Sequence, residues 1–144
     1  SPIHSLARIL NPLGASCGLQ SIFHPGYQGV HRDASGLLGD NSIVIKGDGG
    51  EIEINPDTTS HLYGTTGGAS WDEEWPALSA QRHVKPASLD PEHLKALWRG
   101  EVQDSYPQLA LIATMALALR GLGHPREQAF ELAQQYWDAR NTSN

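Results

Sequence analysis

The chain has 144 residues, of which 39% are hydrophobic and 18% are charged, a composition typical of one soluble globular domain and not of a disordered segment. Its net charge is −6 and its ten basic residues are scattered singly, which argues against the basic stripe of a nucleic-acid-binding module. The single cysteine excludes an internal disulfide and fits a reducing, cytoplasmic location, and the longest apolar helical run is too short to cross a membrane.

The first third of the chain predicts a strand–helix–strand unit. Residues 3–10 carry apolar side chains at helical spacing, and Pro12 ends that helix. Residues 19–23 are a candidate strand, residues 26–38 a helix and residues 42–45 a second strand. This order of elements is typical of a parallel βαβ unit.

Shorter and more polar segments follow. Residues 51–54 alternate polar and apolar side chains, which predicts a half-buried strand, and residues 61–64 are a further short strand candidate. Residues 65–76 are rich in glycine, serine and threonine and then acidic. We expect them to form an irregular loop anchored by Trp71 and Trp75.

Three helices are predicted in the last third. Asp90 is a typical N-cap for a helix that runs to Trp98, residues 106–122 form a largely apolar and therefore buried helix, and Pro125 starts the last helix. The whole pattern predicts a single α/β domain with a mostly parallel sheet flanked by helices.

The most informative stretch is residues 44–53, where a short apolar strand stops at a turn of glycines and acids. Ligands bind beyond the carboxyl ends of strands in open α/β sheets, so Lys46 and Gly47 are candidates for the phosphate side of a ligand site. Carboxylates suit a hard cation such as Mg²⁺, and three lie here: Asp48, Glu51 and Glu53. The alternative interpretation is a surface turn followed by solvated charges on a strand face.

Other candidate sites are weaker. The seven histidines lack metal-ligand spacing, and only His24, at a strand end, stands at a functional position. The glycine-rich stretch 64–68 could cradle an anion, although a flexible loop is the simpler interpretation because no basic residue follows. Cys17 is interpreted as a small buried hydrophobe and not as a nucleophile, and no residue is assigned as catalytic.

Three stretches resemble the anthranilate phosphoribosyltransferase-like family: L-A-R-I-L-N-P at residues 6–12, F-H-P-G-Y at residues 23–27, and V-I-K-G at residues 44–47 with its acidic sequel. The chain looks closest to the YbiB-like branch, which shares the H-x-L-A-[KR] start and the glycine-rich acidic turn. The resemblance implies the C-terminal α/β domain of a nucleoside phosphorylase/phosphoribosyltransferase-like protein. The helical dimerisation domain and pyrophosphate-binding loop of a homodimeric parent would lie upstream.

The resemblance also implies a function. In the family, the intact enzyme transfers a phosphoribosyl group from phosphoribosyl pyrophosphate with Mg²⁺. Asn11 keeps the end of the family's L-G-P-L-T-N-P stretch and is a candidate ligand contact, while Lys46 stands where the family has histidine. The family's metal-binding Asp-Glu pair falls on Ile52 and Glu53, and Glu51 could compensate for the lost aspartate. We therefore expect a degenerate domain that is inactive by itself.

The YbiB-like branch implies an alternative function as well. Its members are not expected to carry the biosynthetic activity, and some are described as nucleic-acid binders. Phosphate contacts would then come from four basic residues: Arg8, Arg32, Arg82 and Lys85.

Overall fold

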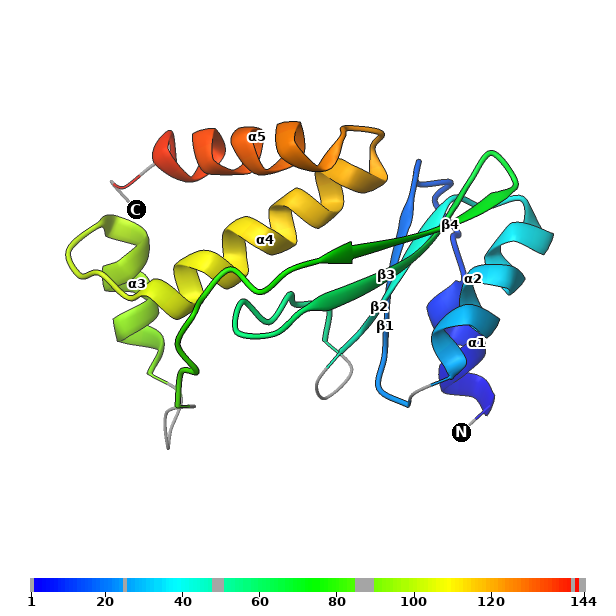
Figure 1. Cartoon of the computed structure of the whole chain (residues 1–144), viewed down its shortest axis with the longest axis horizontal. Coiled ribbons are helices and arrows are strands. Elements are labelled where there is room, and N and C mark those ends of the chain that lie inside the picture. Colours follow the sequence, from blue (N-terminus) through cyan, green and yellow to red (C-terminus); the bar gives the residue numbers. More distant parts are fainter. Residues whose placement is uncertain (1, 25, 48–50, 85–89, 141, 143–144) are drawn as a thin grey trace.

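The computed structural model describes residues 2–24, 26–47, 51–84, 90–140 and 142. Within them, five helices and four strands form an α/β arrangement (Figure 1). The elements in chain order are α1 (Pro2–Ile9), β1 (Gly18–Ile22), α2 (Tyr27–Leu38), β2 (Ser42–Lys46), β3 (Ser60–Thr66), β4 (Ala69–Trp75), α3 (Pro91–Arg99), α4 (Ser105–Gly121) and α5 (Arg126–Asp138). No helix of the described residues is both long enough and apolar enough to cross a membrane.

The sheet has the strand order β1-β2-β3-β4 and is mixed. β1 and β2 are parallel, which confirms the predicted βαβ unit, whereas β2–β3 and β3–β4 are antiparallel. The expectation of a mostly parallel sheet is therefore not met. A parallel return needs a crossover, usually a helix, and the described part of the connection between Lys46 and Ser60 contains none.

Helices cover both faces of the sheet, with α2 on one face and α4 and α5 on the other (Figure 1). Alternate residues of β2 point to opposite faces. Ile43 and Ile45 join a core cluster that includes Leu62, Trp75 and the buried side of α4 and α5. On the opposite face, Thr65 Oγ1 donates a hydrogen bond to the backbone oxygen of Arg32 in α2 at 3.1 Å.

Residues 65–76 are not the irregular loop that their composition predicts. They complete β3 and form β4, joined by a tight turn in which Gly67 and Gly68 have φ values of 57° and 79°. The acidic residues hid the strand, because Glu73 lies on the buried side between the two tryptophans. Its carboxylate accepts hydrogen bonds from Arg120 Nε and Trp75 Nε1, both at 2.8 Å.

The predicted strand at residues 51–54 is also wrong, because these residues have no regular secondary structure. Only the last apolar residue of this alternating segment is buried, and it attaches the segment to α4. Ile54 is buried, and its N–H donates to Thr114 Oγ1 of α4 at 3.0 Å. Glu51, Ile52 and Glu53 are exposed.

The helices are confirmed, and their ends follow the expected chemistry. Asp90 caps α3 by accepting from the backbone N–H groups of Glu92 and His93, and Gly100 ends the helix in the left-handed conformation. Ala113, Ala116 and Leu117 of α4 are fully buried.

Cys17 is half-buried against the core. Burial raises the pKa of its thiol, and a hydrogen bond with the Ile43 backbone offsets part of that rise. A thiol with a raised pKa is a poor nucleophile, so Cys17 fits the predicted role of an unreactive hydrophobe.

Gly64 and Trp71 face each other across β3 and β4, and a Cβ at Gly64 would overlap the Trp71 indole ring. We expect Gly64→Ala to lower the free energy of unfolding by about 1–3 kcal/mol, because the ring must move within a packed face. Urea denaturation measures the change. As a control, Gly29→Ala in α2 meets nothing within 4 Å and should raise the free energy of unfolding by about 0.5–1 kcal/mol. Equal effects of the two substitutions would contradict the expected clash.

Candidate functional site

The parallel strands β1 and β2 end side by side, with Ile22 paired with Lys46. α2 starts at this same edge, after Gly26 turns the chain with φ of 85°. Gln28 ties the turn to the strand: its Oε1 accepts from the Gly26 N–H at 3.0 Å, and its Nε2 donates to the Ile22 oxygen at 3.4 Å. The result is a carboxyl edge formed by two strand ends and one helix N-terminus.

Position 47, at this edge, has room only for a glycine, because the backbone there lies directly against β1. A Cβ at Gly47 would overlap the Ser21 side chain and come within 2.6 Å of the backbone oxygen of Glu51. Ser21 Oγ is itself buried and has no hydrogen-bond partner in the described part of the chain. A glycine is therefore required after Lys46, because any larger residue would overlap the neighbouring strand.

Aromatic rings gather at the carboxyl edge. Phe23 and Tyr27 are both more than half exposed, and the His24 ring lies between them, with centroids 5.3 Å from Phe23 and 6.4 Å from Tyr27. Lys46 is exposed at the end of the neighbouring strand. An anionic ligand with a flat ring would find a cation, a helix N-terminus and aromatic faces together here.

The structure does not bring Asn11 to that edge. Asn11 lies in the loop after α1, where its Oδ1 accepts from the Ala15 N–H at 2.8 Å and its Nδ2 lies 3.5 Å from Asp40 Oδ1. Asp40 precedes β2, so Asn11 is at the opposite end of the strand from Lys46. Its side chain orders the loop locally.

The predicted metal ligands are only partly placed. Glu51 and Glu53 are exposed and follow Gly47, but they do not share a strand face, because residues 51–54 are irregular. Asp48 lies outside the described residues. Among the residues that the structure describes, no group of three or more His, Cys, Asp or Glu side chains is placed to hold a metal ion. Magnesium binding by these carboxylates stays a prediction.

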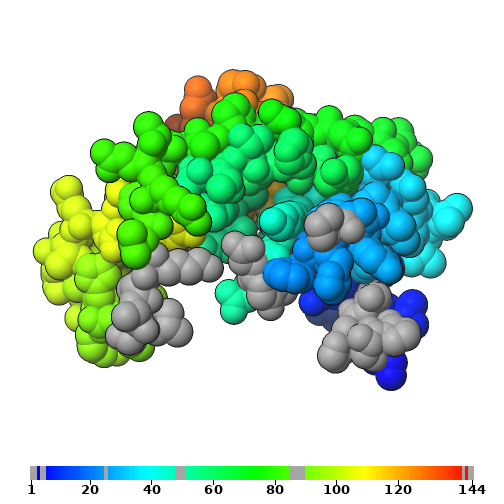
Figure 2. All heavy atoms as spheres, turned by 60° about the horizontal axis from the view of Figure 1, so that its bottom comes forward, coloured from blue at the N-terminus to red at the C-terminus, as the bar shows by residue number. Residues whose placement is uncertain are grey.

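Three of the four basic residues proposed for nucleic acid lie among the described residues, in α1, in α2 and in the segment between β4 and α3. Arg32 is engaged by Asp33 at 2.8 Å and by Asp72 at 2.6 Å, and Arg8 is exposed near the end of α1. Arg82 lies in the segment between β4 and α3, and Lys85 lies outside the described residues. Figure 2 shows the N-terminal segment and the α3 region at opposite ends of this face of the molecule.

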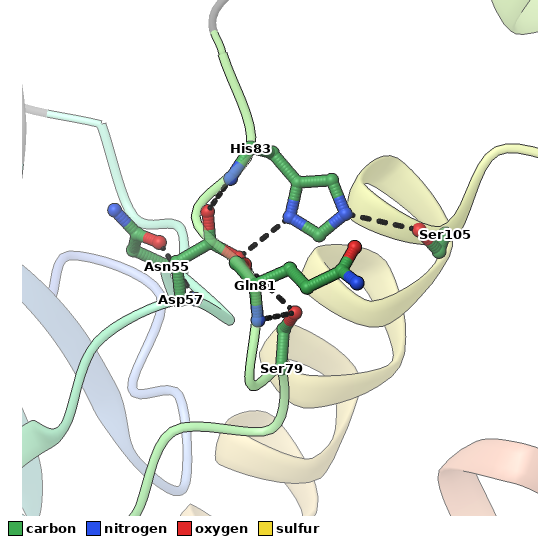
Figure 3. Close-up of polar contacts among 6 residues, drawn as sticks. All are labelled: Asn55, Asp57, Ser79, Gln81, His83 and Ser105. Atoms are coloured by element: carbon green, nitrogen blue, oxygen red, sulfur yellow. Dashed lines mark hydrogen bonds and ion pairs between the residues drawn. The ribbon is translucent and has the colours of Figure 1, made fainter.

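A second polar cluster was missed by the sequence analysis: Asp57, His83 and Ser105 (Figure 3). His83 Nδ1 lies 2.7 Å from Asp57 Oδ1, and His83 Nε2 lies 3.0 Å from Ser105 Oγ. The His83 backbone N–H also donates to Asp57 Oδ2 at 2.6 Å. The three residues come from the β2–β3 connection, the segment before α3, and the first residue of α4, so no local motif could reveal them.

Exposure falls along this cluster from the serine to the aspartate. Ser105 is exposed, while the His83 and Asp57 side chains are 26% and 6% exposed. Burial raises the pKa of Asp57, but the hydrogen bonds from His83 and the charges of His83 and Arg82 outweigh it. The pKa of Asp57 therefore lies below its usual value, and the group is an anion at neutral pH.

No protein-family model matches this sequence, and no curated protein matches it either. The resemblance to the anthranilate phosphoribosyltransferase-like family therefore rests on the short stretches quoted above, and the function has to be argued from the two clusters themselves.

The depressed pKa of Asp57 makes stability depend on pH. We expect Asp57→Asn to lower the melting temperature at neutral pH, because the variant loses the carboxylate that accepts from the backbone N–H and the ring of His83. The ionised Asp57 carboxylate stabilises the fold fully above about pH 3.9, the pKa of an aspartate in the unfolded chain. This stabilisation is lost as the pH falls through the lower pKa that Asp57 has in the folded protein. Wild type and variant should therefore converge in acid, as scanning calorimetry at several pH values can show.

The control is Asp33→Asn, which removes an exposed carboxylate from its contact with Arg32. Exposed ion pairs contribute little, so this variant should melt close to wild type throughout. A constant difference between wild type and Asp57→Asn down to the most acidic pH would contradict the assignment.

Proposed function

We propose that this chain is the C-terminal α/β portion of a phosphoribosyltransferase-like glycosyltransferase homologue, and that its carboxyl edge binds a phosphate-bearing ligand. The observation that carries the proposal is the parallel β1–α2–β2 unit, whose strands end together at Ile22 and Lys46 beside the start of α2. Ligands of open α/β sheets occupy this position. In the intact protein the ligand would be phosphoribosyl pyrophosphate.

The chemistry of the carboxyl edge supports an anionic ligand. Lys46 would contribute a point charge to a phosphate, and the N-terminus of α2 would contribute the positive end of its dipole. The glycine at position 47 lets the chain after Lys46 pack directly against Ser21 of β1, which holds the turn in place. The exposed rings of Phe23 and Tyr27 suit the ribose or a ring attached to it.

The proposal includes magnesium at the same edge. Glu51 and Glu53 are exposed carboxylates just beyond Gly47, and carboxylate oxygens with phosphate oxygens are the ligands that Mg²⁺ prefers. The metal would neutralise the pyrophosphate. Ile52 replaces the expected aspartate, so we expect binding without phosphoribosyl transfer in this chain.

The surface of α1 and α2 fits a domain that docks onto further structure. Large apolar side chains are more than half exposed on α1, on α2 and in the loop between α1 and β1: Ile3, Leu6, Leu10, Leu13, Val30, Leu37 and Leu38. Exposed large apolar side chains in such number are typical of a surface that contacts another domain or protein. The proposed helical domain and dimer partner of the parent protein would account for it.

A titration with phosphoribosyl pyrophosphate and Mg²⁺, followed by amide NMR shifts, tests the proposed ligand site. We expect shifts at Tyr27, Lys46 and Gly47 with a dissociation constant of about 1 mM, because one exposed lysine and one helix N-terminus supply the positive charge of the site. Lys46→Ala should weaken binding about tenfold through loss of a charged contact. Glu53→Ala should remove the dependence on Mg²⁺.

Lys95→Ala is the matched control, because Lys95 is an exposed lysine on α3 that pairs with Glu92 at 2.6 Å. It should leave the titration unchanged. Shifts spread over the whole surface, or none at the carboxyl edge, would reject the proposed site.

Nucleic-acid binding is the second candidate, favoured by the exposed Phe23 and Tyr27 rings, on which unpaired bases can stack. If it is correct, anisotropy of labelled single-stranded DNA should reveal binding that weakens steeply with salt, with a slope of about −0.7 per phosphate contacted. Arg8→Ala should reduce the magnitude of that slope by about 0.7, the value for one phosphate contact. Arg126→Ala on α5 should leave the slope unchanged. No binding at low salt would remove this candidate.

A further inference from the structure

The Asp57–His83–Ser105 cluster has the geometry of a serine nucleophile with its base. In that arrangement a hydroxyl donates to one ring nitrogen of a histidine and a buried carboxylate accepts from the other. Both contacts are present, at 3.0 Å and 2.7 Å, and exposure increases toward the hydroxyl that would meet the substrate (Figure 3).

The surroundings fix the protonation pattern that the chemistry needs. The Asp57 carboxylate is only an acceptor, so the proton of a neutral His83 ring sits on Nδ1. Nε2 then carries the lone pair that accepts the Ser105 hydroxyl proton. Asp57 is held by the His83 backbone N–H and ring together, so it is a positioning residue with a rigid geometry.

The start of α4 offers stabilisation for a developing oxyanion. Ser105 is the first residue of the helix, so its Oγ lies at the positive end of the α4 dipole. The side chain of the N-cap residue Asp104 makes no capping hydrogen bond to the helix and instead contacts His93 Nε2 at 2.9 Å. That carboxylate therefore does not cap the first N–H groups of α4.

An open groove of about 520 Å³ lies between α4 and α5, and its mostly apolar surface includes Leu78, Leu109 and Phe130. Leu109 follows Ser105 by one helical turn, but neither Ser105 nor His83 lines the groove. The groove therefore sets no limit on the acyl group of a substrate at Ser105.

We propose that Ser105 is the nucleophile of an acyl-transfer site that hydrolyses carboxylic esters. Ser105 Oγ bonds to the carbonyl carbon while its proton passes to His83 Nε2. The ester C–O bond then breaks, and the alcohol leaves with that proton. A water gives a proton to Nε2 as its oxygen bonds to the acyl carbon, and cleavage of the Ser105 ester returns the proton to Oγ and releases the acid.

This activity is independent of the ligand site at the carboxyl edge, because it uses none of the residues assigned there. The competing explanation of the cluster is purely structural: Asp57 and His83 would only fasten the segment before α3 to the start of α4. The two explanations differ in the reactivity of Ser105, which a fastening role does not require.

Two measurements on the 144-residue chain test the proposal. A fluorophosphonate probe followed by peptide mass spectrometry should place the label on Ser105, and p-nitrophenyl butyrate should be hydrolysed above the buffer rate. Ser105→Ala should abolish labelling and lower the hydrolysis rate by at least about a hundredfold. Asp57→Asn should lower kcat at least about tenfold with little change in KM, because the aspartate orients the base without touching substrate.

Ser79→Ala is the matched control. Ser79 lies in the same region, but its hydroxyl bonds to the Gln81 backbone and not to His83 (Figure 3). This variant should keep labelling and hydrolysis. Circular dichroism melting checks that Ser105→Ala is folded, which we expect because it loses one exposed hydrogen bond.

Absence of labelling in folded wild type would overturn the proposal, as would equal hydrolysis by wild type and folded Ser105→Ala. If Asp57→Asn fails to fold, the probe and the Ser105→Ala comparison still decide the question.

Discussion

Strand β2 is buried on both faces, and this constraint organises the whole domain. Ile43, Val44 and Ile45 are at most 1% exposed, so each face of the strand has to be covered by helices. α2 covers one face as part of the βαβ unit, and α4 and α5 cover the other. Full burial of such side chains stabilises the fold by about 1.5–3 kcal/mol each, compared with about 0–1 kcal/mol for an exposed ion pair.

The two covered faces are chemically different. The α4 and α5 face is an apolar cluster, whereas the α2 face contains a buried polar network. Gln20 Nε2 donates to Ser35 Oγ at 2.9 Å, and Gln20 Oε1 lies 2.9 Å from His31 Nδ1. Burial lowers the pKa of His31, with a smaller contribution from the charge of Arg8, so the ring stays neutral and its Nδ1–H donates to Gln20. Directional bonds of this kind fix the position of α2, and with it the position of the carboxyl edge.

The sequence predicted what depends on local pattern and missed what depends on partners. Helix signals such as Asp90 and Gly39 act over one turn, and the helices were found close to their true ends. β4 was missed because Glu73 is acidic, although Arg120, forty-seven residues away, pairs with it on a buried face. The Ser105 cluster was missed for the same reason: its three members meet only after α4 packs on the sheet. The motif around Asn11 could not show that its loop lies at the opposite end of β2 from Lys46, because that depends on how the chain enters the sheet.

The connection between β2 and β3 links both candidate sites without merging them. Gly47, Glu51 and Glu53 belong to the carboxyl edge, and Asp57 belongs to the Ser105 cluster. Between them the chain is fixed twice, by Ile54, whose N–H binds Thr114, and by Pro56, which is fully buried and whose oxygen accepts from the N–H groups of residues 78 and 79 at 2.8 and 3.0 Å. These anchors, on α4 and on the segment after β4, separate Glu51 and Glu53 from Asp57 along the chain. The two sites therefore share a scaffold but no side chain, and chemistry at one does not require the other.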